Sequence, residues 1–208
     1  MTTGIITVIV AFITAVVGPI ALEWVKNRLQ KKDKKSSELI AAIEFNERID
    51  NQLDIIMDEL ECDRVWLAQF HNGGHFYPTG RSIQKFSIFY EKVSSETPSI
   101  QNTFQNIPVS LFSKIISKLH KDGEIALINY PEDDEFGLQN MVKEYEVKSW
   151  YTWALHDLDG KFIGVLSVSF TKKSHKFTKD EWIFIRQKIG VIGSLLSSYL
   201  YYQTEKKS

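Results

Sequence analysis

Histidine, asparagine and glycine gather in one short run of the chain, FHNGGHFYPTG, from Phe70 to Gly80. His71 and His75 are four residues apart, which is the spacing of two zinc-binding imidazoles on one helix. The glycine pair between them is typical of loops that cradle a phosphate. Whether either chemistry applies depends on the element that carries the run.

The elements around the run argue against both chemistries. Arg64–His71 has the composition of a strand, and Asn72-Gly73-Gly74 behind it is a turn signal, so no helix holds the two histidines together. Zinc would also need further ligands, and no Cys/His/Asp/Glu cluster lies nearby in the sequence. A phosphate cradle needs a helix N-terminus after the glycines, and a P-loop needs GK[ST]. We therefore predict no metal site and no cofactor.

Two interpretations of the run remain open. It is either a strand-to-strand loop packed by its own aromatic side chains, or a loop that faces a ligand or a partner. The second interpretation rests on the density of polar and aromatic side chains, to which two strand tryptophans are added as the lining of a pocket for a planar ligand. The predicted ligand-binding residues are His71, Asn72, His75, Tyr77, Arg81, Trp66 and Trp153.

Composition and motifs narrow the classes of function. The formal net charge of −1 gives no general case for nucleic-acid binding, and we predict none. The single cysteine, Cys62, excludes an internal disulfide framework and any CxxC motif, and we expect a semi-buried structural thiol. The chain contains no GxSxG, HExxH or comparable signature, so we predict no catalytic residues and no enzyme. Catalytic groups assembled only by geometry escape such a search.

The N-terminus has the pattern of a membrane anchor. Thr3–Leu22 reads TGIITVIVAFITAVVGPIAL, without a charged side chain and long enough to cross about 30 Å of hydrocarbon as a helix. The basic cluster follows this run, whereas a cleaved signal peptide begins with one. A cleaved signal peptide and a buried soluble helix are the alternatives.

The basic cluster also predicts topology. Positive charges after the span indicate a cytoplasmic side, which places the N-terminus outside and the rest in the cytoplasm as a single-pass protein of the cell inner (plasma) membrane. We expect the interfacial aromatic and the basic side chains to meet anionic lipid headgroups, although a solvated linker explains the charges equally well. These predicted membrane residues are Trp24, Lys26, Arg28, Lys31 and Lys32.

The remaining chain alternates helices and strands. Helices are expected at 36–60, from about Ser110 to Lys121, at 136–145 and from Thr178 to about Gln203. Thr178 and Glu181 form a capping-box signature for the last of these. Strands are expected at 64–71, 83–91, 124–130, 149–157 and 162–171, with a two-residue turn at Asp159-Gly160.

The last helix carries more apolar residues than one stripe requires. One line follows the 3, 4 spacing of a coiled-coil seam, and Phe184, Val191 and Leu195 form a second line beside it. One face is expected on the sheet and the other on a partner helix, as in a homodimer; the alternative is that both lines are intramolecular core. The predicted dimer-helix residues are Ile185, Ile189, Ile192 and Leu196.

The element order resembles the GAF domain, a PAS-like sensory fold. The segments that carry the resemblance are DLDGKFIGVLSVSF, from Asp157 to Phe170, and KFTKDEWIFIRQKIGVIGSLL, from Lys176 to Leu196. The resemblance implies an α+β fold with a central antiparallel five-stranded sheet, flanking N- and C-terminal helices and a ligand pocket on one face. The NKFDE motif of the cyclic-nucleotide-binding branch is absent. The predicted domains are an anchor at 1–25, a basic juxtamembrane linker at 26–36 and a GAF-like cytoplasmic domain at 37–206.

Three functions follow as hypotheses. The first is a membrane-anchored sensory module that binds a small molecule or nucleotide and has no catalytic output domain. The second is a structural dimeric adaptor that tethers a protein partner at the membrane. The third is a small effector whose anchor permeabilises the membrane when a signal binds.

Overall fold

The computed structural model describes residues 18–75, 78–129 and 136–205 of a chain that divides into two compact units, Met1–Asn46 and Glu47–Ser208. In the first unit the described backbone is the N-terminal part of helix α2 (Gly18–Leu60). Residues 26–36, predicted as a linker, are helical and belong to α2. Most of the predicted span Thr3–Leu22 lies outside the described residues. Within the described ranges no helix has the length and apolar character that crossing a bilayer requires.

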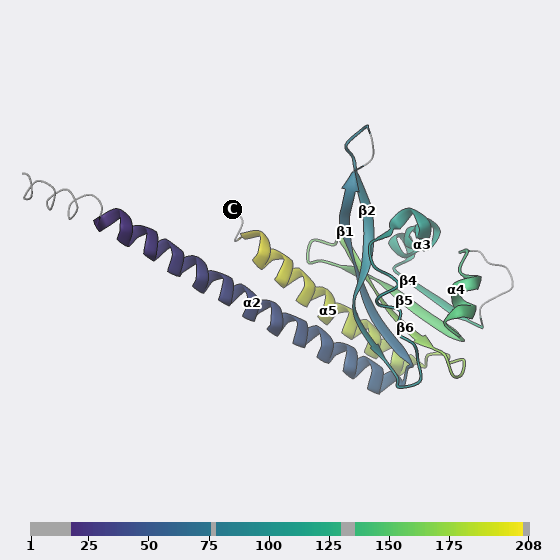
Figure 1. Ribbon diagram of the computed structural model, residues 1–208. Helices are drawn as coiled ribbons and strands as arrows, with labels where there is room; N and C mark the ends of the chain where they lie inside the picture. Colours follow the sequence, from purple (N-terminus) through teal and green to yellow (C-terminus); the bar gives the residue numbers. More distant parts are fainter. Residues whose placement is uncertain (1–17, 76–77, 130–135, 206–208) are drawn as a thin grey trace, which may run out of the picture. The chain divides into compact units, whose positions relative to one another are not determined.

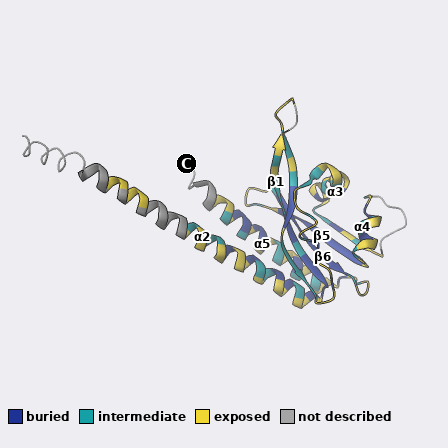
Figure 2. Ribbon diagram, viewed as in Figure 1, coloured by how far each residue is buried: buried dark blue, intermediate teal, exposed yellow. Residues whose placement is uncertain are grey.

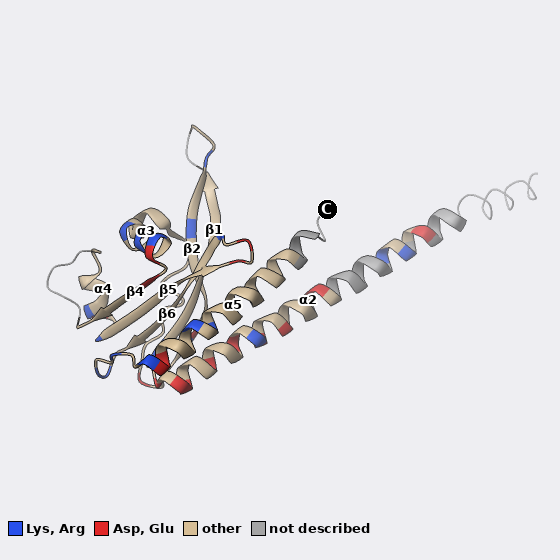
Figure 3. Cartoon of the chain, turned by 180° about the vertical axis from the view of Figure 1, so that it is seen from behind, with Lys and Arg blue, Asp and Glu red and all other residues tan. Residues whose placement is uncertain are grey.

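Three of the predicted membrane residues have described side chains. Trp24, Lys26 and Arg28 are exposed on α2, and the guanidinium carbon of Arg28 lies 4.5 Å from the centre of the Trp24 ring. The side chains of Lys31 and Lys32 lie outside the described part of the chain. Figure 3 shows that acidic side chains lie along the later turns of the same helix.

The second unit is built on one sheet of six strands, in the order β3-β2-β1-β6-β5-β4, with every neighbouring pair antiparallel. The strands are β1 (Arg64–His75), β2 (Ser82–Val93), β3 (Ile107–Pro108), β4 (Glu124–Ile128), β5 (Ser149–His156) and β6 (Phe162–Phe170). The predicted count of five strands was wrong because β3 is only two residues long and contains a proline. A proline is tolerated at a sheet edge, and this short edge strand leaves no alternating pattern to recognise.

Helices cover both faces of this sheet (Figure 1). Helix α5 (Lys179–Glu205) and the last turns of α2 lie on one face, while α3 (Ser113–Asp122) and α4 (Gln139–Glu144) lie on the other. The neighbouring strands β5 and β6 are buried along almost their whole length, as Figure 2 shows. Side chains buried on the α5 face include Val65, Leu67, Tyr151, Trp153, Leu155, Leu166, Val168 and Phe170 from the strands.

The apolar residues of α5 that have coiled-coil spacing pack in the core of the domain. Ile185, Ile192 and Leu196 are wholly buried and Ile189 is half-buried, so these predicted dimer residues are covered within the protomer. Ile49, Leu53, Ile56 and Leu60 of α2 are buried as well. Lys188 of α5 donates a hydrogen bond to the Gln52 side chain of α2 at 3.0 Å. The apolar line therefore forms core, and it is not the exposed face that a partner helix requires.

Local signals placed the start of the last helix, α5, but not the form of the β5–β6 turn. The capping box is confirmed: the Thr178 N–H donates to Glu181 Oε2 at 2.7 Å, and the Glu181 N–H donates to Thr178 Oγ1 at 3.2 Å. The β5–β6 turn differs from the predicted two-residue form. The Asp157 N–H bonds the Lys161 carbonyl, and the Gly160 N–H bonds the Asp157 carbonyl, which makes a loop from Leu158 to Gly160. Gly160 has a φ of 77°, the left-handed conformation that this longer loop requires.

The helices on the other face begin later than predicted. A 3₁₀ turn, η2 (Val109–Phe112), precedes α3, and Ser110 lies inside that turn without a capping hydrogen bond. Helix α3 places Ile115 and Leu119 in the core and ends at Gly123, whose φ is 81°. Helix α4 is shorter at both ends than the predicted segment 136–145.

Candidate functional site

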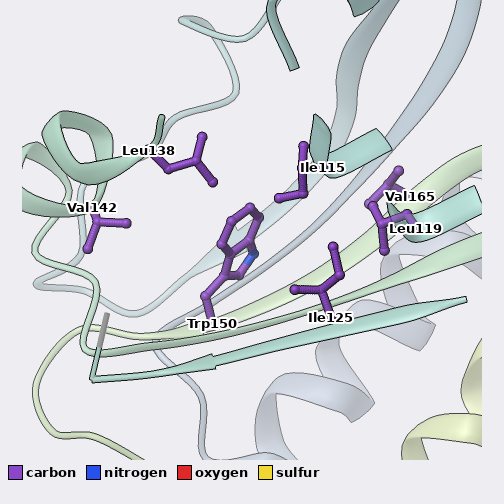
Figure 4. Packing of buried hydrophobic residues seen from close by; sticks show 7 residues of the cluster. All are labelled: Ile115, Leu119, Ile125, Leu138, Val142, Trp150 and Val165. Atoms are coloured by element: carbon purple, nitrogen blue, oxygen red, sulfur yellow. The ribbon is translucent and has the colours of Figure 1, made fainter. Parts of the chain in front are cut away.

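An apolar chamber lies between the sheet and the α3–α4 layer. Alternate residues of the strands point to this face, and the apolar face of α3 closes over them. Figure 4 shows Trp150 among Ile115, Leu119, Ile125 and Val165, with Leu138 and Val142 contributed from the α4 side. The cavity has a volume of about 60 Å³. Its lining is Trp66, Ala68, Phe86, Ile88, Ile100, Phe104, Phe112, Ile115, Ile116, Leu119, Met141, Trp150, Thr152 and Val165.

A smaller cavity that has a polar end adjoins the chamber. This second space, of about 30 Å³, shares Trp66, Ile100, Met141 and Trp150 with the first. Arg64 of β1 and Ser169 of β6 also line it, and they are direct partners in the antiparallel register. Residues opposite each other in such a register project from the same face of the sheet. We call these two side chains the polar end of the chamber.

Arg64 is held by groups around its guanidinium. Its Nη2 donates to the Pro98 carbonyl at 2.7 Å, and its Nε lies 3.5 Å from Glu91 Oε1, outside hydrogen-bond geometry. The ring of Tyr145 lies 5.8 Å from the guanidinium carbon. Burial lowers the pKa of Arg64, while the negative charges of Glu91 and Asp63 act in the opposite direction.

Glu91 fixes the loop beside the chamber. Its carboxylate accepts the Ile100 N–H at 3.0 Å and the Gln101 N–H at 3.0 Å, and it also accepts the Ser99 hydroxyl. The side chains of Glu91 and Arg64 are almost fully buried, with 2% and 1% exposure. A buried charge is costly without a partner, so Glu91 and Arg64 stabilise each other inside the domain. The hydrogen bonds from the loop to Glu91 also hold Ile100 in the chamber wall.

A more open groove lies on the surface at the base of the β1–β2 arm. It has a volume of about 470 Å³, and its polar lining comes from Gln69, His71, Asn72, Gln84 and Lys161. His71 Nε2 forms a 2.9 Å hydrogen bond with Ser87 Oγ, and the Gln84 side-chain amide donates to Asn72 Oδ1 at 2.9 Å. The side chains of His71, Asn72 and Gln84 are therefore already hydrogen-bonded within the protein.

The structure separates the predicted ligand-binding residues. Trp66 lines the chamber, whereas His71 and Asn72 line the groove. His75 and Arg81 are exposed on the β1–β2 arm, and Tyr77 lies outside the described residues. Trp153 projects from the opposite face of the sheet, where its ring stacks against Tyr151 and Phe177. These residues therefore do not form one site.

The HNGGH run is part of a strand. β1 continues to His75, and a Cβ on Gly73 would overlap only the flexible Lys85 side chain of β2, which can move aside. Three strand residues lie between the two histidines, so the backbone does not form the helix that the i, i+4 spacing of zinc ligands requires. Among the described residues no group of three or more His, Cys, Asp or Glu side chains is placed to hold a metal.

Cys62 is more deeply buried than the semi-buried thiol predicted from the sequence. It is 4% exposed, and burial raises the pKa of its thiol to about 12. A nucleophilic cysteine needs a thiolate at neutral pH. Cys62 therefore packs at the junction of α2 and β1 as a small apolar side chain.

The sequence alone did not identify the polar end. Arg64 stands at the start of a strand, where an arginine is normally exposed, and Ser169 is one of several serines in β6. Met141 of α4 and Tyr145 at the end of α4 line the same cavity, although they are far from Arg64 in the sequence. The strand register would have revealed the polar end, because it places the charged Arg64 opposite Ser169 on an otherwise apolar face of the sheet.

No protein-family model and no curated protein matches this sequence. Solved structures do match. A GAF domain from Synechocystis sp. PCC6803, in its photoproduct state, is 14% identical with a TM-score of 0.59, over 77% of this chain and 98% of that one. The PixJ GAF domain of Thermosynechococcus elongatus is 17% identical with a TM-score of 0.57, over 82% and 92% of the two chains.

A phycocyanobilin-bound GAF domain from a cyanobacterial phytochrome gives 16% identity and a TM-score of 0.52, over 75% of this chain and 91% of that one. At these identities the likeness establishes the fold. The chain has a GAF-like α+β fold with a central antiparallel sheet.

Proposed function

We propose that this chain is a sensory module that binds a small molecule in the apolar chamber and is anchored to a membrane through residues 1–25. The observation that carries the ligand-binding role is the chamber itself. Close packing normally leaves few voids larger than a water molecule in a domain core. Here a cavity remains on one face of the sheet, under several short elements, and a second cavity with a polar end adjoins it. The proposal assigns the chain no catalytic step.

The dimensions of the chamber limit the ligand. Pockets for drug-sized ligands have volumes of about 300–1,000 Å³, several times the 60 Å³ found here. A linear tetrapyrrole such as the phycocyanobilin of the similar structure is therefore too large for this chamber. A nucleotide also fits poorly, because its phosphates would enter an apolar lining. The proposed ligand is smaller and mainly apolar.

Filling the chamber tests this role. Ala68→Val adds two methyl groups at a chamber-lining position, whereas Ala126→Val adds them at an exposed position of β4. We expect xenon under pressure and small alkanes to raise the melting temperature of the wild type and of Ala126→Val, but not that of Ala68→Val. Equal responses of all three proteins, or none in the wild type, would contradict a ligand chamber. Added phycocyanobilin should leave the absorption spectrum of the pigment unchanged.

The anchor is tested on the full-length chain. We expect it in the membrane fraction of a cell lysate, released by detergent and not by high salt. Ile9→Lys places a charge near the middle of the predicted span and should shift the protein to the soluble fraction, while Thr2→Lys at its edge should not. Wild type found in the soluble fraction would remove the anchor from the proposal.

A dimeric adaptor is the second candidate, and the small size of the chamber favours it over a sensor of large ligands. Helix α5 keeps three aliphatic side chains exposed beside its buried seam, Ile183 at 58%, Val191 at 44% and Leu200 at 41%. Sedimentation equilibrium of the full-length chain in detergent decides the oligomeric state. A dimer that Val191→Glu dissociates would support the adaptor, and a monomer at every concentration would exclude a homodimer.

A further inference from the structure

Two buried polar atoms at the end of the chamber have no hydrogen-bond partner among the described residues. They are the Nε of Arg64 and the Oγ of Ser169. Both residues are 1% exposed, and both line the same cavity of about 30 Å³. A buried donor or acceptor that stays unpaired costs free energy, so such groups are normally matched.

Neighbouring polar groups on this sheet face are matched inside the protein. The Ser167 hydroxyl donates to the Tyr151 carbonyl at 3.1 Å and accepts the indole N–H of Trp150. The Thr152 hydroxyl donates to the Leu166 carbonyl at 3.2 Å. Three buried side-chain atoms in the described part of the chain are unpaired, and two of them lie together at the polar end, next to the apolar chamber. The third, Trp153 Nε1, belongs to the opposite face of the sheet.

We propose that the polar end binds the oxygen of a small neutral molecule, a ketone, aldehyde or alcohol, whose hydrocarbon part occupies the apolar chamber. This inference rests on the proposed ligand-binding function and adds the chemical class of the ligand. The Arg64 Nε–H donates to the ligand oxygen. The Ser169 hydroxyl is the second donor, and it is an acceptor when the ligand carries its own hydroxyl.

The charges around the polar end select a neutral head group over an anion. Arg64 is a cation whose charge Glu91 already balances at 3.5 Å, and Asp63 adds a further negative charge nearby. A carboxylate ligand would bring an additional anion into a buried site, where an uncompensated charge is strongly disfavoured. A carbonyl or hydroxyl oxygen accepts the same hydrogen bonds without adding a charge.

The volume of the chamber sets the size of the molecule. An apolar cavity of about 150 Å³ holds benzene in another protein. The chamber has about 60 Å³ and its polar extension about 30 Å³. The ligand that fits without a change in the walls is therefore smaller than benzene, with about four or five heavy atoms.

The test uses the full-length protein in detergent, labelled with ¹⁵N-arginine, and three probes. Xenon tests binding in the apolar chamber alone. 2-Butanone tests the effect of a neutral oxygen on a hydrocarbon chain, and butanoate tests the effect of a charged carboxylate. We expect 2-butanone to shift the slowly exchanging Nε–Hε resonance of Arg64 and to bind more tightly than butanoate. Ser169→Ala should weaken 2-butanone about fivefold, the size of one lost hydrogen bond, and should leave xenon binding unchanged.

Thr152→Val is the matched control, because it changes a chamber-lining hydroxyl that is already bonded. It should not alter the preference for 2-butanone over butanoate. If Ser169→Ala fails to fold, Ser169→Cys gives the same comparison with a weaker donor. Xenon binding combined with equal 2-butanone affinity in wild type and Ser169→Ala would mean that the polar end holds only water, which overturns this inference and leaves the chamber in place. Tighter binding of butanoate would overturn the neutral class, and no binding of any probe would overturn the chamber as well.

Discussion

Gly193 of α5 faces the backbone carbonyl oxygen of His156 at the end of β5, and a Cβ at position 193 would lie 2.8 Å from that oxygen. The partner is backbone, which cannot rotate away as a side chain can. This contact explains the glycine by the approach of a helix to its own sheet. The nearby Ser197 hydroxyl of α5 accepts the Leu158 N–H at 2.8 Å, which fixes the same end of the sheet against the helix.

The first prediction uses two glycines three residues apart in α5. Gly193→Ala should destabilise the protein by about 1–3 kcal/mol, because the new methyl group overlaps the His156 carbonyl. Gly190→Ala should stabilise it by about 0.5–1 kcal/mol, because nothing lies within 4 Å of a Cβ there and alanine is the better helix former. Urea unfolding of both variants measures the difference. Equal effects would mean that α5 does not approach β5 at Gly193.

The second prediction concerns Asp63 and pH. Burial acts to raise the pKa of Asp63, but the backbone N–H groups of Thr171 and Lys172 and the Lys172 charge outweigh it and hold the pKa below its ordinary value. The Thr171 N–H donates to Asp63 Oδ2 at 2.8 Å. Asp63→Asn should therefore cost about 1–3 kcal/mol at pH 7.

A lowered folded-state pKa fixes the direction of the pH effect. The stabilisation from Asp63 is fully present above its unfolded pKa of about 3.9 and is lost as pH falls through the lower folded value. The stability gap between wild type and Asp63→Asn should therefore narrow below about pH 4. Asp159→Asn, on an exposed loop, is the control and should change stability by less than about 0.5 kcal/mol. If the stability difference between wild type and Asp63→Asn stays constant down to about pH 2, the pKa of Asp63 is not lowered in the folded protein in the way proposed.

The third prediction tests the α5 capping box. Thr178→Ala removes the hydroxyl that accepts the Glu181 N–H and should cost about 1 kcal/mol. Lys179→Ala, beside it on the exposed surface, should change stability by less than about 0.5 kcal/mol. Thermal unfolding followed by circular dichroism measures both. No loss in Thr178→Ala would show that the cap contributes nothing to stability.

The fourth prediction concerns the buried Arg64–Glu91 pair. Glu91→Leu removes the partner of a buried cation together with the acceptor of the Ser99, Ile100 and Gln101 hydrogen bonds, and should cost about 3–5 kcal/mol. The double variant Arg64→Met, Glu91→Leu removes both charges and should lose less than the sum of the two single changes. Denaturant unfolding of the wild type, Arg64→Met, Glu91→Leu and the double variant gives a double-mutant cycle. If the losses of stability in the two single variants add up to the loss in the double variant, the two groups do not interact.

The fifth prediction concerns thiol reactivity. Cys62 has a pKa raised to about 12 by burial, so a thiol reagent at about pH 8 should modify it only as fast as the protein opens. Adding urea above the unfolding midpoint should accelerate the reaction by orders of magnitude. Ser117→Cys on the exposed side of α3 provides an accessible thiol for comparison. Rapid modification of Cys62 in the native wild type would contradict its burial.

Local sequence signals predicted most of the regular elements. The alternation in Phe162–Phe170 and the Thr178–Glu181 capping box identified β6 and the start of α5, because these signals depend only on residues a few positions apart. The two-residue β3 and the loop from Leu158 to Gly160 were missed or simplified, since an edge pairing and a turn type depend on the strands beside them. The heptad-like spacing of α5 was real but ambiguous, because an internal core and a partner helix require the same apolar pattern.

The sequence by itself determined the apolar N-terminal run and most of the order of helices and strands, because both follow from local composition and periodicity. The tertiary structure decided which side chains meet. It placed Trp66 and Trp153 on opposite faces of one sheet, and it brought Arg64 opposite Ser169, more than a hundred positions away in the chain. Strand order and register set these contacts, and they depend on the packing of the whole domain.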